Sequence, residues 1–333
     1  MSDRRLLGGG NLIDRIVADI KAGYGIVCHQ VTPIDGGWQN RLWRAQTDGG
    51  DILIKQYSGK RFRDSQLHAI DTALLRQVAM TASGIPCPRI YLCGGHALRW
   101  IEDATVYAVM DFCPGQNEHA GTITHLQMES LGSVCAQMQN AFARLSADAV
   151  KGYPIDCGQV YRSLWENFDT RRQDLRPQTP LDYSQALLAQ EPILRQLDES
   201  FFRALPKGIA HEDFTSDNIL FDKNGVSAVI DFDRNQYGFV WHDIGRAILS
   251  FALEEQSLNT DKIRAFRSGY TQYRPLSPAD IGDALRITWC IEALWWIQPA
   301  YFAMESCKAT QYREELVWLT DHWSAIDSIC RGI

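Results

Sequence analysis

The sequence lacks the features that would place the chain in a membrane or on nucleic acid. No segment reaches the 18 or more uninterrupted apolar residues of a membrane-spanning helix, and the longest apolar stretch, around 247–253, is interrupted by Ser250. Positive charge is not in excess, because 40 Asp and Glu outnumber 33 Lys and Arg and give a net charge of −7. Nucleic-acid binders usually carry the opposite balance. We therefore expect no membrane span and no nucleic-acid partner.

Two further absences concern the cellular compartment. The first residues contain no apolar segment of the kind that forms a secretory signal. The nine cysteines are odd in number, and no two of them have the CxxC spacing of zinc and redox sites. Unpaired thiols are typical of a reducing compartment. We therefore expect a cytoplasmic protein with free cysteines.

The composition is that of a globular protein. Apolar residues make up 45% and charged residues 22% of the 333 residues, a balance that excludes disordered and collagen-like chains. The length allows one large domain or two lobes.

Residues 1–112 predict a small lobe of strands with one helix. Apolar residues at helical spacing predict the helix over 67–84, and Gly84 followed by Pro86 ends it. Short apolar runs bounded by turn residues predict five strands, at 27–34, 42–45, 51–57, 90–93 and 106–112.

Residues 113–333 predict a second, mainly helical lobe. A short β-hairpin over 219–230, with its turn at 223–225, interrupts the helices. Helices are expected at 126–145, 183–205, 244–253, 280–304 and 314–329. The fold class is therefore α+β, with lobes at 1–112 and 113–333.

The most informative segment runs from His211 to Asp233. Asp213 precedes Asn218 by five residues on a loop that enters a strand, and Asp231 follows Asp213 by eighteen residues, at the end of the next strand. A hairpin between the two strands would bring Asp213, Asn218 and Asp231 to one site. Oxygen-bearing side chains suit Mg²⁺, which takes few protein ligands and binds substrate phosphates. A nearby carboxylate can accept the proton of an attacking hydroxyl, as kinases require.

This segment resembles the catalytic block of the aminoglycoside phosphotransferase and choline kinase-like family, and looks closest to its homoserine kinase-like and spore-coat-type branches. The resemblance covers about residues 30–300. It implies a bilobal protein-kinase-like fold, with a five-stranded antiparallel sheet plus a helix in the first lobe. It also implies that Asp213 is the catalytic base, that Asn218 and Asp231 bind Mg²⁺, and that Asp243 steadies the catalytic loop.

On the nucleotide side, Gly36, Gly37 and Asn40 fall where this family has its phosphate-covering loop. Glycines let backbone amides approach phosphate oxygens. Lys55, eighteen residues after Gly37, resembles the family's ATP-phosphate lysine. The family pairs that lysine with an acidic residue on the following helix. That helix contains no Glu here, and Asp71 lies nearest to the expected place.

Met110, Asp111 and Cys113 resemble the family hinge, whose backbone groups bind adenine. Recognition by backbone gives no reason to prefer ATP over GTP, so either nucleoside triphosphate is expected to bind.

The acceptor-binding residues are expected between the catalytic loop and the C-terminal helices. The candidates are Asp217, Asp233, Glu292, Trp295 and Trp296. Glu292, Trp295 and Trp296 lie at spacings of three and four residues, which place them near one face of a helix. A carboxylate with indoles can hold a cationic amine through charge and cation–π contacts. In the simpler interpretation, both tryptophans are core residues and Glu292 is solvated.

Together these residues predict an ATP- and Mg²⁺-dependent kinase that phosphorylates a small-molecule hydroxyl on an amino alcohol, amino sugar or aminoglycoside. One alternative is a degenerate, nucleotide-binding kinase that acts as a regulator or partner protein, favoured only by the missing Glu. A protein kinase is disfavoured, because only eleven residues separate Asp231 from Asp243 and leave no room for an activation segment. The acceptor, the nucleotide and the oligomeric state stay open.

Overall fold

The chain falls into two compact units. One comprises Met1–Pro114 with Phe232–Arg234, and the other comprises Gly115–Asp231 with Asn235–Ile333. The short segment 232–234 thus belongs to the first unit, although both of its neighbours along the chain belong to the second. The computed structural model describes residues 9–34, 40–58, 62–101, 105–145, 155–304 and 306–333.

The first unit is built on a five-stranded antiparallel sheet, as predicted. The strand order is β1-β2-β3-β5-β4, and every neighbouring pair is antiparallel. The strands are β1 (Cys28–Ile34), β2 (Arg41–Thr47), β3 (Ile52–Tyr57), β4 (Leu98–Ile101) and β5 (Thr105–Asp111).

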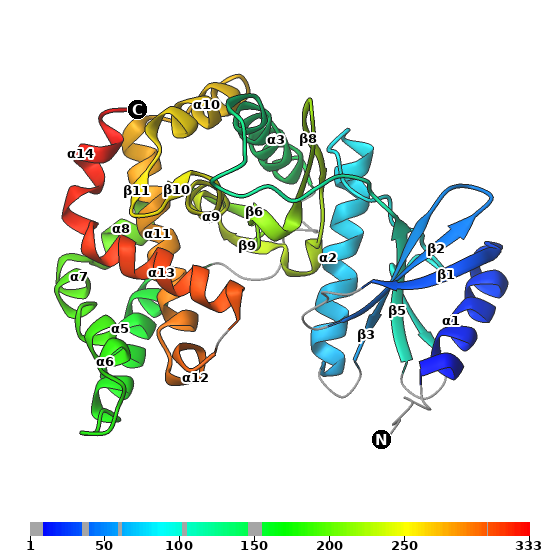
Figure 1. Ribbon diagram of the computed structural model, residues 1–333, viewed down its shortest axis with the longest axis horizontal. Coiled ribbons are helices and arrows are strands. Elements are labelled where there is room, and N and C mark those ends of the chain that lie inside the picture. The colour runs from blue at the N-terminus through cyan, green and yellow to red at the C-terminus, as the bar shows by residue number, and fades with distance from the viewer. Residues whose placement is uncertain (1–8, 35–39, 59–61, 102–104, 146–154, 305) are drawn as a thin grey trace. The chain divides into compact units, whose positions relative to one another are not determined.

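Two helices cover the two faces of this sheet, α1 (Gly9–Tyr24) and α2 (Asp64–Ala82) (Figure 1). Side chains alternate along a strand, so in β5 Val106 packs on the α2 side and Tyr107 on the α1 side. In β3, Leu53 and Tyr57 face α2. Lys55 lies between them in the same alternation and therefore shares the α2 face.

Two details of the first unit differ from the prediction. Residues 90–93 form only isolated bridges, because Gly94 and Gly95 adopt positive φ angles of 61° and 85° and turn the chain back. The edge strand β4 follows that turn. The helix α1, for which no prediction was made, buries Ile16 and Ile20 against the sheet.

The second unit is mainly helical, as predicted. No helix in its described residues, or elsewhere in the described chain, is long and apolar enough to cross a bilayer. Its α-helices are α3 (His125–Ala143), α5 (Cys157–Gln173), α6 (Leu181–Leu188), α7 (Glu191–Gln196), α8 (Glu199–Ala204), α9 (Trp241–Ala252), α10 (Thr260–Thr271), α11 (Pro278–Trp296), α12 (Pro299–Phe302), α13 (Cys307–Asp321) and α14 (Ile326–Cys330).

Three strand pairs complete the second unit. The predicted hairpin is present as β7 (Ile219–Asp222) and β8 (Gly225–Val229). The other pairs, which were not predicted, are β6 (Lys207–Ala210) with β9 (Gln236–Phe239) and β10 (Leu253–Glu254) with β11 (Ser257–Leu258).

Prolines and capping side chains set several helix boundaries that differ from the prediction. The expected helix over 183–205 is three helices, because Pro192 lies in the first turn of α7 and Asp198 caps α8. The expected helix over 280–304 ends at Trp296, and Pro299 starts α12. Ser306 caps α13, which begins seven residues before the predicted start at 314.

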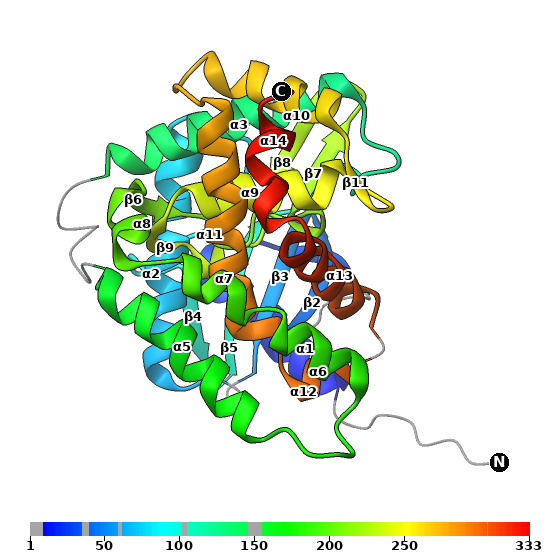
Figure 2. The same cartoon turned by 90° about the vertical axis from the view of Figure 1, so that its left-hand side faces the viewer.

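Helix α9 is the centre of the second unit, and all of its residues from His242 to Ala252 are buried. Helix α11 contacts α9, α13 and α14, and α3 lies beside α10 (Figures 1 and 2). Glycines permit the close α3–α10 approach. A Cβ at Gly132 would lie 1.9 Å from the Phe266 carbonyl oxygen, and one at Gly269 would lie 1.8 Å from the Glu129 carbonyl oxygen.

The Gly132→Ala variant should therefore destabilise the second unit. Both clashes are with helix backbone, which cannot move aside as a flexible side chain can, so we expect a loss of about 1–3 kcal/mol. Urea denaturation followed by circular dichroism measures it. Gly49→Ala is the matched control, because its nearest neighbour would be the Thr47 hydroxyl at 3.8 Å. Equal stability of the two variants would contradict the tight helix contact.

Candidate functional site

The catalytic loop begins where β6 ends, and a buried carboxylate holds its backbone. Asp243, in the first turn of α9, accepts the backbone N–H of His211 at 2.7 Å and that of Glu212 at 3.0 Å. The Asp243 side chain is fully buried. Burial and the nearby Glu212 carboxylate raise the pKa of Asp243 to about 7, although the two N–H groups oppose the shift. These contacts agree with the loop-steadying role that the resemblance implied.

Hydrogen bonds bring the predicted catalytic and metal residues of the second unit together. The Asn218 amide nitrogen donates to the Asp213 carbonyl at 2.9 Å. The backbone N–H of Ile230, which precedes Asp231, donates to the Asn218 carbonyl at 2.9 Å. The His211 ring lies 3.1 Å from the Ile230 carbonyl through Nε2. These bonds join Asp213 to Asn218 and Asn218 to Ile230, so the segments that carry Asp213, Asn218 and Asp231 lie next to one another.

The donor set of this cluster fits a hard divalent cation. The Asn218 amide nitrogen is engaged, so its oxygen can face a ligand. Asp231 is exposed and adds a carboxylate, and its backbone is left-handed, with φ of 60°. Mg²⁺ prefers such oxygen ligands and keeps few of them from protein. The Asp213 carboxylate accepts no hydrogen bond and forms no ion pair within the described part of the chain. It is therefore available to accept a proton.

Glu212, next to Asp213, also has a left-handed backbone, with φ of 65°. A non-glycine residue there costs about 1–2 kcal/mol. Its carboxylate Oε2 lies 3.4 Å from Nδ1 of the buried His242. A Cβ at residue 238 would lie 2.0 Å from Glu212 Oε1, so only Gly238 leaves room for this carboxylate. The chain thus holds Glu212 in place in spite of the backbone cost.

From Glu212, a series of buried charges extends toward α13. Nε2 of His242 lies 3.3 Å from Glu292, whose Oε1 is 3.7 Å from the Arg246 Nε. Arg246 Nη1 donates to Glu315 Oε2 at 2.8 Å. Acids and bases alternate along this series, which we call the buried charge chain: Glu212, His242, Glu292, Arg246 and Glu315.

The buried charge chain shifts the protonation of its members. Burial alone would lower the pKa of His242, but the flanking Glu212 and Glu292 carboxylates outweigh burial and raise it to about 10. Burial would raise the pKa of Glu292, but Arg246 and His242 lower it to about 2. At neutral pH both groups are therefore charged and balance one another.

The predicted acceptor group on α11 is not assembled as expected. The Glu292 carboxylate is engaged by His242 and Arg246, and the Trp296 indole N–H also donates to it. Trp296 stacks on Tyr312, with ring centroids 4.6 Å apart, whereas Trp295 is 60% exposed. Adjacent helical residues point in different directions, so the two indoles do not share a face.

Helix α13 also supplies a side chain that contacts the catalytic loop. Lys308 Nζ lies 2.8 Å from the predicted acceptor residue Asp217. Burial lowers the pKa of Lys308, but Tyr312, Asp213 and Asp217 together raise it above its usual value. The Arg246 guanidinium lies 4.3 Å from the centre of the Tyr312 ring. The sequence offered no signal for Lys308 and Tyr312, which lie about ninety residues beyond the catalytic motif.

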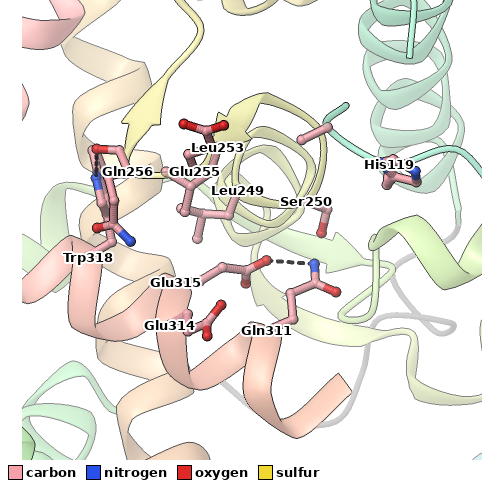
Figure 3. A pocket seen from close by; sticks show the side chains of 11 residues that line it. His119, Leu249, Ser250, Leu253, Glu255, Gln256, Gln311, Glu314, Glu315 and Trp318 are labelled. Atoms are coloured by element: carbon pink, nitrogen blue, oxygen red, sulfur yellow. Dashed lines mark hydrogen bonds between the residues drawn. The ribbon is translucent and has the colours of Figure 1, made fainter. Parts of the chain in front are cut away.

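A cavity of about 280 Å³ opens within the second unit along the same helix. Figure 3 shows its walls, which come from α9, the β10–β11 turn, α13 and the segment before α3. The polar lining side chains are His119, Ser250, Glu255, Gln256, Gln311, Glu314 and Glu315. Trp318 also lines it and donates its indole N–H to the Gln256 carbonyl at 2.9 Å.

Two of the three carboxylates of this cavity have no partner among the described residues. Neither Glu255 nor Glu314 forms an ion pair or hydrogen bond with a described residue, and both are exposed. The buried Ser250 hydroxyl has no hydrogen-bond partner. Glu315 accepts from Gln311 as well as from Arg246. The cavity therefore presents negative charge to any molecule that enters it.

In the first unit, the expected pairing of Lys55 with Asp71 is wrong. Lys55 Nζ lies 2.8 Å from Asp233 Oδ2, and both side chains are largely buried. Asp71 instead accepts the backbone N–H groups of Ala97 and Leu98, each at 2.8 Å, and lies 2.8 Å from His96 Nδ1. Asp233, predicted to bind the acceptor, is therefore the partner of the lysine.

Two backbone N–H groups of the hinge are already engaged within the first unit. The N–H of Asp111 donates to the Arg89 carbonyl, so it is not available to adenine, and the N–H of Phe112 donates to the Asp51 carbonyl. Among the described residues, the backbone of Cys113 forms no hydrogen bond. Met110, also predicted at the hinge, has its side chain in the core on the α2 side.

The predicted phosphate-covering loop is only partly described. Gly36 and Gly37 lie outside the described residues. Asn40 follows them, and its buried side-chain oxygen has no hydrogen-bond partner among the residues that the structure describes.

Comparisons with known proteins identify the family of the chain. Residues 30–276 match the sequence profile described as the phosphotransferase enzyme family. A homoserine kinase of Paramagnetospirillum magneticum is 27% identical over 281 residues, which are 82% of this chain and 80% of the relative. A homoserine kinase of Xanthobacter autotrophicus is 27% identical over 246 residues, 73% of this chain and 71% of the relative.

Solved structures share the fold over almost the whole chain. A spectinomycin phosphotransferase in complex with ADP and spectinomycin has a TM-score of 0.64 and 12% identity, with 96% of this chain and 98% of that chain covered. A microcompartment-associated aminopropanol kinase has a TM-score of 0.63 and 16% identity, with coverage of 95% and 99%. The predicted family and fold are confirmed.

The protonated His242 predicts a pH dependence of stability. Since its pKa is raised from 6.5 to about 10, its contribution is fully present below pH 6.5 and is lost as the pH rises toward 10. The His242→Gln variant should therefore lose less stability than the wild type between pH 6.5 and 9.5. Urea denaturation at both pH values measures the difference. The exposed His125→Gln serves as control, and a His242→Gln profile parallel to the wild type would contradict the assignment.

Proposed function

Because this chain belongs to the phosphotransferase enzyme family and is a small-molecule kinase, we propose that it transfers the terminal phosphoryl group of ATP, with Mg²⁺, to the hydroxyl of a small amine-bearing acceptor. The observation that carries the proposal is the cluster in which Asp213 keeps an unengaged carboxylate beside Asn218 and Asp231. Kinases need such a carboxylate next to metal ligands.

We assign one role to each side chain of the cluster. Asp213 would accept the proton of the acceptor hydroxyl as its oxygen attacks the terminal phosphorus, and ADP would leave. Asn218 and Asp231 would hold Mg²⁺, which neutralises phosphate charge when bound. Asp243 fixes the loop backbone on which the general base stands.

The nucleotide would be held by groups of the first unit. The buried Lys55 ammonium is suited to phosphate oxygens. Adenine would bind the free backbone groups of Cys113 and not the N–H of Asp111, which is engaged. Backbone recognition admits GTP as well as ATP. Gly36, Gly37 and Asn40 remain the proposed cover of the phosphates.

The acceptor would bind along α13 and in the acidic cavity. The charge of Asp213 contributes to the raised pKa values of Lys308 and Tyr312. Glu314 and Glu315 follow on the same helix, at the cavity wall. Carboxylates and an indole suit an ammonium group. The volume of about 280 Å³ lies just below the range for ligand pockets, roughly 300–1,000 Å³. It therefore favours an amino alcohol or a single amino sugar over a large aminoglycoside.

The alternative of a degenerate regulator loses its support. It depended on the absence of a Glu partner for Lys55 on α2, which would have left the lysine unconstrained. Asp233 provides that lysine with a carboxylate at 2.8 Å.

The Asp213→Ala variant tests the catalytic assignment. Loss of the general base should lower kcat by a factor on the order of a hundred or more, with nucleotide binding kept. ATP and GTP consumption with Mg²⁺ should be measured across amino alcohols, amino sugars, aminoglycosides and neutral sugars, and ADP binding by calorimetry. Full transfer activity in Asp213→Ala would refute the assignment.

Glu255→Gln and Glu314→Gln test the acceptor site. Each removes one unpaired carboxylate, so the KM for an amine acceptor should rise several-fold while the KM for ATP stays constant. Steady-state kinetics with the best acceptor of the panel measures both constants. Glu166→Gln is the control, because Glu166 is also exposed and lies on α5 away from the cavity lining. If Glu166→Gln raised the KM for the amine acceptor as much as the two cavity variants do, the cavity would not be the acceptor site.

A further inference from the structure

Lys55 is a buried cation that needs a fixed counter-charge. Its side chain is about 6% exposed, on the face of β3 that α2 covers. An ionised amine is costly to bury unless it is paired and hydrogen-bonded. Asp233 Oδ2 lies 2.8 Å from its Nζ, and the Tyr57 hydroxyl donates to the other oxygen, Oδ1, at 3.0 Å. The aspartate is therefore oriented from both sides.

Asp71, the acidic residue of α2 expected to pair with Lys55, cannot serve as its counter-charge. Both carboxylate oxygens of Asp71 are used by the segment that enters β4, through the N–H groups of Ala97 and Leu98 and the ring of His96. Asp71 is itself buried. Its role is therefore to tie α2 to that segment.

The second observation is the position of Asp233 in the sequence. It lies in the three-residue turn Phe232–Arg234, which clusters with the first unit and contacts α2. Phe232, the first residue of this turn, is fully buried. Asp231, the proposed metal ligand, directly precedes the turn. One short segment thus carries a carboxylate for the metal and, two residues later, a carboxylate for the lysine.

We propose that Asp233 is the positioning residue for Lys55, in place of an acid on α2, and that it directs the ammonium toward the nucleotide phosphates. This inference rests on the proposed function. An ammonium has three N–H donors, so one ammonium can contact a carboxylate and phosphate oxygens at the same time. Because Asp233 is joined to Asp231 by the chain, the phosphate-binding lysine would be positioned by the segment that is also proposed to bind the metal, and not by an acidic side chain of α2.

The test compares a ligand that has phosphates with one that has none. Lys55 acts on phosphate, so Asp233→Asn should weaken ADP binding about tenfold and leave adenosine binding unchanged. Calorimetric titrations of the full chain with ADP and with adenosine measure both constants. The ADP titrations are run in EDTA. A loss of ADP affinity that acts through a metal at Asp231 would disappear without metal, whereas a loss that acts through Lys55 would persist.

Three variants make the comparison specific. Tyr57→Phe removes one donor to Asp233 and should give a smaller loss of the same kind. Asp71→Asn is the matched control, which should lower the melting temperature but keep the ratio of ADP to adenosine affinity. Lys55→Ala with Asp233→Asn should bind ADP no more weakly than Lys55→Ala alone, because residues that act together are not additive.

The outcomes separate the inference from the proposed function. The positioning role alone is overturned if the wild-type protein binds ADP but Asp233→Asn leaves the ratio of ADP affinity to adenosine affinity unchanged. A change of that ratio in Asp71→Asn overturns it as well. Additive losses in the double variant overturn it as well. Wild-type protein that binds neither ADP nor adenosine overturns both the proposed function and the role of Asp233.

Discussion

The site depends on the buried carboxylate of Asp243. It accepts two successive backbone N–H groups of the catalytic loop and so fixes where His211 and Glu212 lie. A loop cannot be buried with its N–H groups unpaired, and these two have their partner in the most buried helix of the unit. The position of Asp213, one residue further, follows from this contact, and Asn218 is then tied to the Asp213 carbonyl. The order of the loop thus originates in α9 rather than in the loop itself.

The buried charge chain adds a second constraint, of a different kind. Charges taken out of water must be balanced locally, and here a histidine and an arginine alternate with three glutamates from the loop to α13. Its last member, Glu315, is also a wall of the acidic cavity. The cavity wall and the loop are therefore parts of one electrostatic arrangement, and the left-handed Glu212 is tolerated because this arrangement holds its carboxylate.

The local parts of the fold and site could be predicted from sequence, whereas the long-range pairings could not. Asp213 and Asn218 lie just before the first strand of one hairpin and Asp231 just after the second, so their spacing was enough to predict that these segments meet. The sheet strands followed from apolar runs, although the Gly94-Gly95 turn moved the edge strand. The partners of Lys55 and Glu292 depend on how distant segments pack. Asp71 lay at helical spacing near the expected place, but it accepts the N–H groups of Ala97 and Leu98 at the start of β4. Asp233 is 178 residues from Lys55 along the chain. Neither pairing leaves a periodic signal in the sequence.

The turn Phe232–Arg234 has a consequence for how the molecule can be divided. Because three residues from the middle of the second unit complete the first, the chain passes between the units three times, and no single cut separates them. A recombinant fragment that ends at Pro114 would expose the surface of α2 that contacts this turn and would leave the Lys55 ammonium without the Asp233 carboxylate. The first unit is compact in space but discontinuous in sequence. Its folding is therefore completed only after synthesis has passed residue 234, when more than two thirds of the chain has been made.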